Sequence, residues 1–153
     1  MHLIKSITDI INYLKNQLHE TDITLYAGAT DLEIYEFEIS AGVKLPDDIR
    51  QFYQFTNGFM SDEDLFRIVP LNELIHSNSL YIAEFLIYSD LWELIINPAE
   101  NNYYEITCTD KDQNKLVLTT SFFEFIQHFL IGGVFEKDGL YDWTNAIAAK
   151  NRK

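Results

Sequence analysis

The sequence predicts a single domain of the α+β class, with helical segments before and after a β-rich central part. A chain of 153 residues fits one domain, and 47% of its residues are hydrophobic, enough to build a sizeable core. Helical periodicity is present before residue 60 and again after residue 120, whereas runs rich in β-branched and aromatic residues lie between. Neither an internal repeat nor a long linker divides the sequence, so we expect one domain over residues 1–153.

The N-terminal segment has the pattern of an amphipathic helix from about Lys5 to His19. Apolar residues recur there at steps of three and four, which places them on one stripe: Ile4, Ile7, Ile10, Ile11, Leu14 and Leu18. Polar residues interrupt the segment, so it resembles neither a signal peptide nor a membrane span. The single cysteine, Cys108, cannot form an internal disulfide and fits a reducing compartment. We therefore expect a cytoplasmic protein.

The run Thr30-Asp31-Leu32-Glu33 matches a capping box that begins a second helix. Thr30 can accept a hydrogen bond from the amide of Glu33, while the Glu33 side chain reaches back to the amide of Thr30. Gly42 suits the left-handed conformation that follows a helix end, so we expect this helix to run to Ala41.

The segment LPDDIRQFYQFTNGF, residues 45–59, predicts a third and short helix with a defined start and a defined end. Pro46 suits the first helical position because an amide hydrogen would be unpaired there in any case. Asn57 and Gly58 tolerate the positive φ of a helix exit. Four residues fall on the face that we expect to point inward: Ile49, Phe52, Tyr53 and Thr56.

The central part predicts the strands of the sheet. LFRIVPL is typical of a short strand ended by Pro70, and LNELI of a helical turn. Residues 81–98 fit two strands around a turn at Ser89-Asp90, with a helix from Leu80 to Tyr88 as the alternative. The clearest hairpin joins NYYEITCT to NKLVLTTS through the turn formers DKDQ.

Two closing helices follow the hairpin. Ser121 and Glu124 match a second capping box, and Gly132-Gly133 ends the helix that begins there. Its apolar stripe should pack on the sheet: Phe122, Phe125, Ile126, Phe129 and Leu130. The tail from Gly139 predicts a last short helix.

Acidity is the strongest global feature, because 24 Asp and Glu against 11 Lys and Arg give a formal net charge of −13. Such a field repels nucleic acid and anionic membranes, which proteins bind mainly through Lys and Arg. Between Ile68 and Asp110 there is no Lys or Arg, but there are seven acids: Glu73, Glu84, Asp90, Glu93, Glu100, Glu105 and Asp110. This window is either a solvated face that favours solubility or a docking surface for a basic partner.

Motifs for catalysis, cofactors or metals are missing from the sequence. The histidines His2, His19, His76 and His128 are dispersed, and there is neither a G-x-S-x-G elbow nor a Gly-rich phosphate loop. The turn after Thr109 imitates a calcium loop but has Lys115 where glycine is required and Ser121 where glutamate is required. Asp62-Glu63-Asp64 is an acidic cluster that we expect to be solvated. We expect no catalytic residue, no metal and no cofactor.

The order of these elements resembles the SUKH superfamily, which groups a yeast cell-wall synthesis regulator with many bacterial proteins. The resemblance is carried by EFEISAGVKLPDDIRQFYQFTNGF, by FRIVPLNEL with the hairpin, and by TTSFFEFIQHFL, and it extends from about Thr30 to Leu130. Phe59-Met60-Ser61 stands where some members have a tryptophan and an acidic pattern. The signature positions in this chain are Gly42, Leu45, Pro46, Asn57 and Gly58.

This resemblance implies a curved, mostly antiparallel sheet flanked by helices, and no catalytic activity. Many bacterial members resemble immunity proteins that neutralise a cognate toxin, often a nuclease, of contact-dependent or secreted polymorphic toxin systems. It also implies that the signature residues fix the fold and that the residues specific for a partner lie elsewhere.

An inhibitor of a basic toxin benefits from an acidic surface, because complementary fields accelerate association. The window without Lys or Arg also carries aromatic residues, which are common in interface hot spots, although a single aromatic residue more often fills the core. We predict a patch that faces the toxin, formed by Glu84, Tyr88, Asp90, Trp92 and Glu93. The alternatives are a non-catalytic adaptor, and an enzyme, which would need a polar cleft with perturbed carboxylates. The sequence names neither the toxin nor the oligomeric state.

Overall fold

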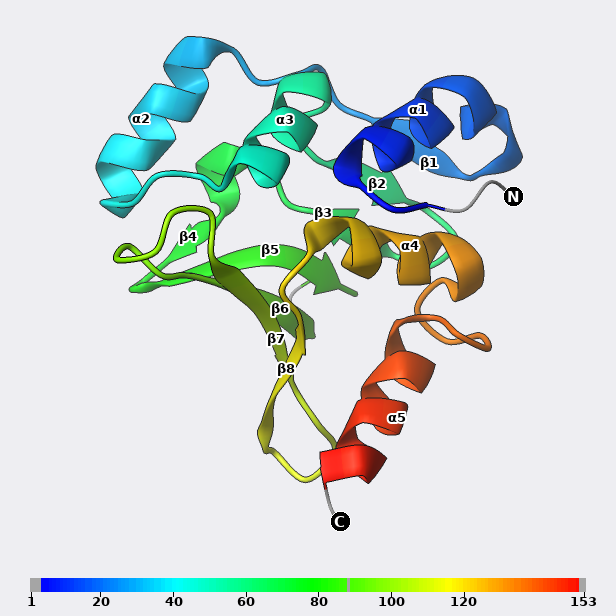
Figure 1. Ribbon diagram of the computed structural model, residues 1–153. Coiled ribbons are helices and arrows are strands. Elements are labelled where there is room, and N and C mark those ends of the chain that lie inside the picture. Colours follow the sequence, from blue (N-terminus) through cyan, green and yellow to red (C-terminus); the bar gives the residue numbers. More distant parts are fainter. Residues whose placement is uncertain (1–3, 88, 152–153) are drawn as a thin grey trace.

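A computed structural model describes residues 4–87 and 89–151 and shows an α+β fold in which helices cover one face of a sheet (Figure 1). The helical elements are α1 (Ile7–Gln17), η1 (Leu18–Glu20), α2 (Asp31–Ala41), α3 (Asp47–Phe55), η2 (Leu71–Glu73), α4 (Phe122–Gly132) and α5 (Leu140–Asn151). The strands are β1 (Ile23–Leu25), β2 (Phe59–Ser61), β3 (Phe66–Ile68), β4 (Ile75–His76), β5 (Ser79–Phe85), β6 (Asp90–Ile96), β7 (Tyr104–Thr109) and β8 (Lys115–Thr119).

The strands form one open sheet in the order β1-β2-β3-β5-β6-β7-β8, and β4 pairs with β5 beside this path. Every strand pair among the described residues is antiparallel, so the predicted α+β class with a mostly antiparallel sheet is confirmed. The sheet twists strongly towards β7 and β8, and α1, α3 and α4 lie over its upper face in Figure 1. Helix α5 packs beside the lower end of the β7–β8 hairpin.

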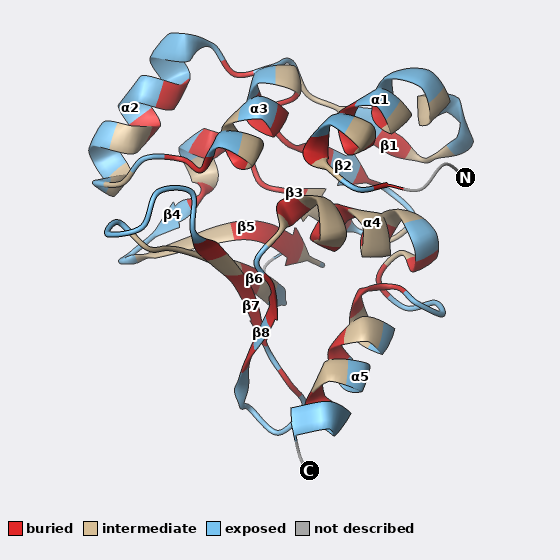
Figure 2. Ribbon diagram, in the orientation of Figure 1, coloured by how far each residue is buried: buried red, intermediate tan, exposed pale blue. Residues whose placement is uncertain are grey.

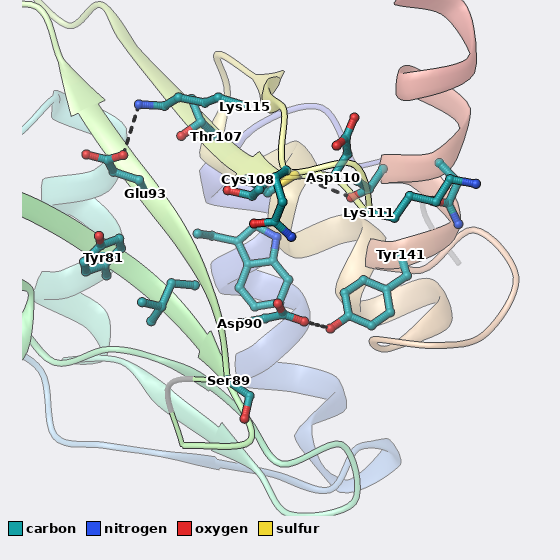
Figure 3. A pocket seen from close by; sticks show the side chains of 16 residues that line it. Tyr81, Ser89, Asp90, Glu93, Thr107, Cys108, Asp110, Lys111, Lys115 and Tyr141 are labelled. Carbon is teal, nitrogen blue, oxygen red and sulfur yellow. Dashed lines mark hydrogen bonds and ion pairs between the residues drawn. The ribbon is translucent and has the colours of Figure 1, made fainter.

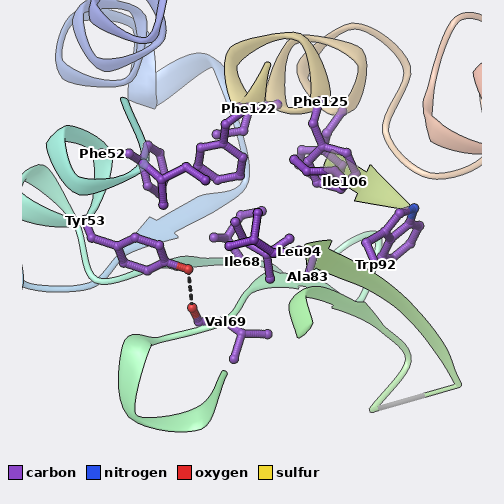
Figure 4. Packing of buried hydrophobic residues seen from close by; sticks show 14 of the residues in the cluster. Phe52, Tyr53, Ile68, Val69, Ala83, Trp92, Leu94, Ile106, Phe122 and Phe125 are labelled. Carbon is purple, nitrogen blue, oxygen red and sulfur yellow. Dashed lines mark hydrogen bonds between the residues drawn. The ribbon is translucent and has the colours of Figure 1, made fainter. Parts of the chain in front are cut away.

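An aromatic core fills the space between the sheet and the helices α3 and α4 (Figure 4). The rings of Phe52 and Phe122 meet edge to face at 5.0 Å, and Phe66 stacks on Phe129 at 4.2 Å. The hydroxyl of Tyr53 donates to the carbonyl oxygen of Val69 at 2.7 Å, so this buried polar atom has a partner. Buried residues accordingly concentrate where the helices face the strands, whereas the outer sides of the helices are exposed (Figure 2).

The first two predicted helices form close to their expected ends. Helix α1 begins at Ile7, where the Ser6 hydroxyl accepts from the Asp9 amide at 3.3 Å, and η1 continues it to Glu20. In α2 both halves of the predicted capping box are present, and Gly42 ends the helix at φ 72°. The local side-chain signals therefore act as expected.

The signature segment, residues 42–58, surrounds α3 and is held by contacts inside the protein. Pro46 is the N-cap of α3, one residue before the first helical position for which it was predicted, because the helix begins at Asp47. The amide of the buried Leu45 donates to Oε2 of Glu38 at 2.7 Å. Of the two residues expected to tolerate a positive φ at the helix exit, Gly58 adopts one, at 95°, and Asn57 does not. Asn57 instead uses its side chain, whose Oδ1 accepts from the amide of Leu71 at 2.9 Å. The Asn-Gly pair thus joins the exit of α3 to the start of η2.

The second predicted capping box, at Ser121, is wrong. The Ser121 side chain makes no cap for α4. The amide of Phe122 donates instead to the hydroxyl of Tyr104 on β7, at 2.5 Å, and that hydroxyl donates in turn to the carboxylate of Asp48 on α3. A sequence pattern of four residues cannot detect this cap, because the capping oxygen belongs to Tyr104, which lies 18 positions before Phe122 on β7.

The strand predictions hold best for the longer strands. Strands β5 and β6 exclude the alternative helix from Leu80 to Tyr88 as far as residue 87, and Tyr88 itself lies outside the described residues. The hairpin of β7 and β8 is confirmed. Strands β1 and β2 were not predicted, because three residues are too few to show an alternating pattern and no proline marks their ends as Pro70 does for the equally short β3. Over residues 4–87 and 89–151, no helix combines the length and the apolarity that crossing a bilayer requires.

Candidate partner-binding surface

Trp92, one member of the predicted patch, lies in the core and not at the surface. Side chains alternate along β6, so Leu91 and Glu93 face away from the helices while Trp92 faces α4. The indole is only 2% exposed and packs against Phe66 at 5.6 Å and Phe125 at 5.9 Å. The prediction that Trp92 is exposed to a partner is therefore wrong, and the ring has the ordinary role of a buried aromatic residue.

Glu84 is also buried, on the sheet face opposite to the helices. Its Oε1 pairs with Nε of Arg67 at 2.9 Å, and the same guanidinium binds Oε1 of Glu73 at 2.9 Å. The other oxygen, Oε2, has no hydrogen-bond partner among the described residues. A Glu84→Lys change would place a second cation beside Arg67, so Glu84 cannot be used to test an interface without disturbing the fold.

Asp90 and Glu93 remain accessible, and the structure brings them to the same groove (Figure 3). Tyr88 lies outside the described residues, so its place in the patch stays a prediction. The structure thus separates the members of the predicted patch. Asp90 and Glu93 line a groove at the surface, whereas Glu84 and Trp92 are buried.

The groove has a volume of about 820 Å³ and is lined by the strands β5 to β8 and the helix α5. Glu93, Thr107 and Lys115 line it from the sheet face turned away from the helices, and Tyr141, Thr144 and Asn145 line it from α5. The turn from Asp110 to Asn114 also contributes lining residues. There Oδ1 of Asp110 accepts from the amides of Asp112 at 2.8 Å and Asn114 at 2.9 Å, so this loop is a hairpin turn as predicted.

Each acid of the groove is already bound to a group of the protein. The hydroxyl of Tyr141 donates to the carboxylate of Asp90, and Nζ of Lys115 lies 3.2 Å from Oε1 of Glu93. With Asp110 and Lys111, the groove carries three acids and two lysines. Its local charge is therefore only slightly negative, and the strong field around the protein comes from the whole chain.

The groove contains a thiol whose environment keeps it protonated. Burial raises the pKa of Cys108 to about 11, and a contact of 3.9 Å with Oγ1 of Thr144 lowers it only in part. A thiol with such a pKa is a poor nucleophile at neutral pH. Among residues 4–87 and 89–151, no group of three His, Cys, Asp or Glu side chains is placed to bind a metal ion.

Tyr141, Thr144 and Asn145 belong to the candidate site but could not have been recognised from the sequence. They lie on α5, which the sequence predicts only as a closing helix. Tyr141 is 51 positions away from its partner Asp90. Helix α5 reaches this groove because the chain turns after α4 and places α5 beside the β7–β8 hairpin.

The sequence matches the model of a known protein family. The sequence model of the SMI1 / KNR4 family (SUKH-1) matches residues 28–128, about two thirds of the chain. No curated protein matches the sequence. The matched residues include the whole signature segment and the strands of the groove, whereas α1 and α5 lie outside them.

Proposed function

Because the chain belongs to the SMI1 / KNR4 family (SUKH-1), we propose that it is a cytoplasmic immunity protein that binds and neutralises a cognate toxin. Immunity is a common role in this family, whose members are generally non-catalytic. Helices α1 and α5 pack on the same core as the matched residues, which supports one domain over residues 1–153. We propose a basic toxin, often a nuclease in such systems, as the partner.

The groove beside α5 is the observation that carries this proposal. It is a hollow of about 820 Å³ that offers carboxylates, hydroxyls and the ring of Tyr141 to a protein partner. The net charge of −13 would attract a basic toxin over long range, since complementary fields raise association rates. In the complex, Asp90 would lose its hydrogen bond from Tyr141 and Glu93 would lose its ion pair with Lys115. Both carboxylates would then bind cationic groups of the toxin.

Growth of cells that express the toxic C-terminal domain encoded beside this gene tests the function. Cells that also express this protein should survive, and cells without it should not. The purified pair should bind, and the double variant Asp90→Lys with Glu93→Lys should bind at least tenfold more weakly. Its free energy of unfolding should change by less than about 1 kcal/mol, because the hydrogen bond from Tyr141 to Asp90 and the ion pair of Glu93 with Lys115 both lie at the surface, where such contacts contribute little.

Charge reversal at Glu20 and Glu36 provides the matched control. Both residues are exposed and lie outside the groove, on η1 and α2, and the net charge changes by the same amount. This variant should lose long-range attraction but keep its contacts in the groove. If both variants lose the same affinity for the toxin, the groove is not the binding site. Absence of rescue, with both proteins expressed, would contradict immunity to this toxin and favour an adaptor.

A further inference from the structure

A patch of large apolar side chains is exposed at the end of the β5–β6 hairpin, next to the groove. We call this patch the apolar tip and define it as Leu65, Leu86, Ile87 and Phe135. Their exposed fractions are 56%, 45%, 84% and 62%. Single exposed apolar residues are ordinary, but a cluster of four marks a surface that other molecules contact.

Three segments of the chain bring these residues together. Phe66 on β3 is paired with Phe85 on β5, and just beyond this pair the amide of Leu86 donates to the carbonyl oxygen of Leu65 at 2.9 Å. The ring of Phe135, between α4 and α5, meets the ring of Phe85 at 5.2 Å. The four residues of the apolar tip thus come from segments that contact one another.

The backbone of the apolar tip opposes stability. Leu65, Leu86 and Ile87 have φ values of 53°, 51° and 48°, in the left-handed region. This conformation is unfavourable for every residue except glycine, and most of all for a β-branched residue such as Ile87. Asn, Asp or Gly would suit an exposed turn better. The apolar side chains therefore do not stabilise the turn. Contact with a partner would explain why large apolar residues are present there.

Exposed acids are close in sequence to the residues of the apolar tip. Five exposed acids lie in the segments that form it or directly follow them: Asp62, Glu63, Asp90, Glu136 and Asp138. Lys137 is the cation among them. Burial raises the pKa of Asp64, the hydrogen bond from the Val134 amide lowers it, and the nearby charges of Asp22 and Glu136 raise it further. An apolar centre with an acidic rim fits a partner with an apolar centre and a basic rim.

We propose that the apolar tip is the anchor by which this protein docks the basic toxin, and that the groove extends the same interface. This inference rests on the proposed function. The two surfaces are continuous, because the ring of Tyr141 lies 5.4 Å from that of Phe135 while its hydroxyl binds Asp90 in the groove. A second copy of the chain is a poor occupant, since its acidic rim would meet an identical acidic rim.

The double variant Leu86→Asn with Ile87→Asn tests the anchor. Asparagine removes the apolar surface but tolerates the left-handed conformation, so the variant should fold with an unchanged or higher thermal midpoint. Its affinity for the purified toxin domain should fall roughly 30-fold or more, as expected for the loss of an interface hot spot. The matched control is Leu32→Gln with Ile39→Gln on α2, at 63% and 66% exposed, which should bind like the wild type.

The outcomes separate this inference from the function on which it rests. If the wild type binds the toxin and the tip variant binds equally well, the anchor is wrong and the proposed function stands. If the α2 control loses as much affinity as the tip variant, the effect is not specific to the tip and the inference also fails. A wild type that does not bind the toxin overturns both. A dimer in sedimentation that the tip variant dissociates would assign the patch to a second copy instead.

Discussion

The signature segment and the apolar tip both contain left-handed backbone, but they place different residues there. Gly42 and Gly58 occupy φ 72° and 95° in the signature segment, whereas Leu65, Leu86 and Ile87 occupy φ 53°, 51° and 48° in the tip. Glycine removes the strain of this conformation, and large side chains retain it. The comparison indicates that the first region is built for stability and the second for its surface.

Contacts distinguish the two regions in the same way. In the signature segment, Asn57 and Leu45 are hydrogen-bonded to other parts of the chain, and Gly58 lies against the backbone of Ile68. In the tip, Ile87 and Phe135 are mostly exposed. We therefore expect substitutions in the first region to change the free energy of unfolding and substitutions in the second to change binding.

The largest effect on stability is expected from Gly58→Ala. A Cβ atom at this position would lie 2.3 Å from the carbonyl oxygen of Ile68, and the residue would be held at φ 95°. The backbone must move to relieve this contact, so the variant should lose about 3 kcal/mol or more of its free energy of unfolding. Urea titration followed by circular dichroism measures the loss.

Gly42→Ala is the control for this change. Gly42 has a similar φ, but a Cβ atom there would meet nothing within 4 Å. Only the strain of the left-handed conformation remains, which costs about 1 to 2 kcal/mol. Equal losses at the two glycines would show that close packing of Gly58 on β3 does not matter for the fold.

A smaller loss is expected from Tyr104→Phe, which tests how α3 is joined to the rest of the core. The change removes the hydroxyl that binds both Asp48 on α3 and the amide of Phe122 at the start of α4. The buried amide of Phe122 would then lack a partner, at a cost of about 2 kcal/mol. The neighbouring Tyr103→Phe removes an exposed hydroxyl that binds only Glu105, so it should stay within about 0.5 kcal/mol of the wild type.

The smallest effect is expected next to the tip, from Asp64→Asn, and it should be a gain in stability that depends on pH. The pKa of Asp64 is raised in the folded protein, so the folded state holds the proton more tightly than the unfolded chain does. The charged form therefore destabilises the fold at neutral pH, and this penalty disappears below the unfolded pKa of about 4.

Asparagine cannot ionise, but it keeps an oxygen that can accept from the amide of Val134. The variant should be more stable than the wild type at pH 7, by less than about 1 kcal/mol, and equally stable at pH 3. Urea titrations at the two pH values measure the difference. A variant that is less stable at pH 7 would contradict the view that acids at the tip work against the fold.

Prediction from the sequence succeeded where the signal is local and failed where a partner is distant. The capping box of α2 and the end at Gly42 depend on residues within four positions of each other, and both are present. The cap of α4 depends on Tyr104, 18 positions away from Phe122, and was assigned to the wrong side chain. The predicted patch failed in part for the same reason, because Glu84 pairs with Arg67 and Trp92 faces α4.

The sequence by itself determined the class of the fold, the ends of α2 and the inward face of α3, because these follow from spacing along the chain and from the conformational preferences of Gly and Pro. The tertiary structure alone decided which acids are bound internally, where α5 lies, and that Leu65, Leu86 and Phe135 share one surface. Burial and pairing are properties of groups that meet in space, and hydrophobic periodicity does not record which distant segment a side chain will meet.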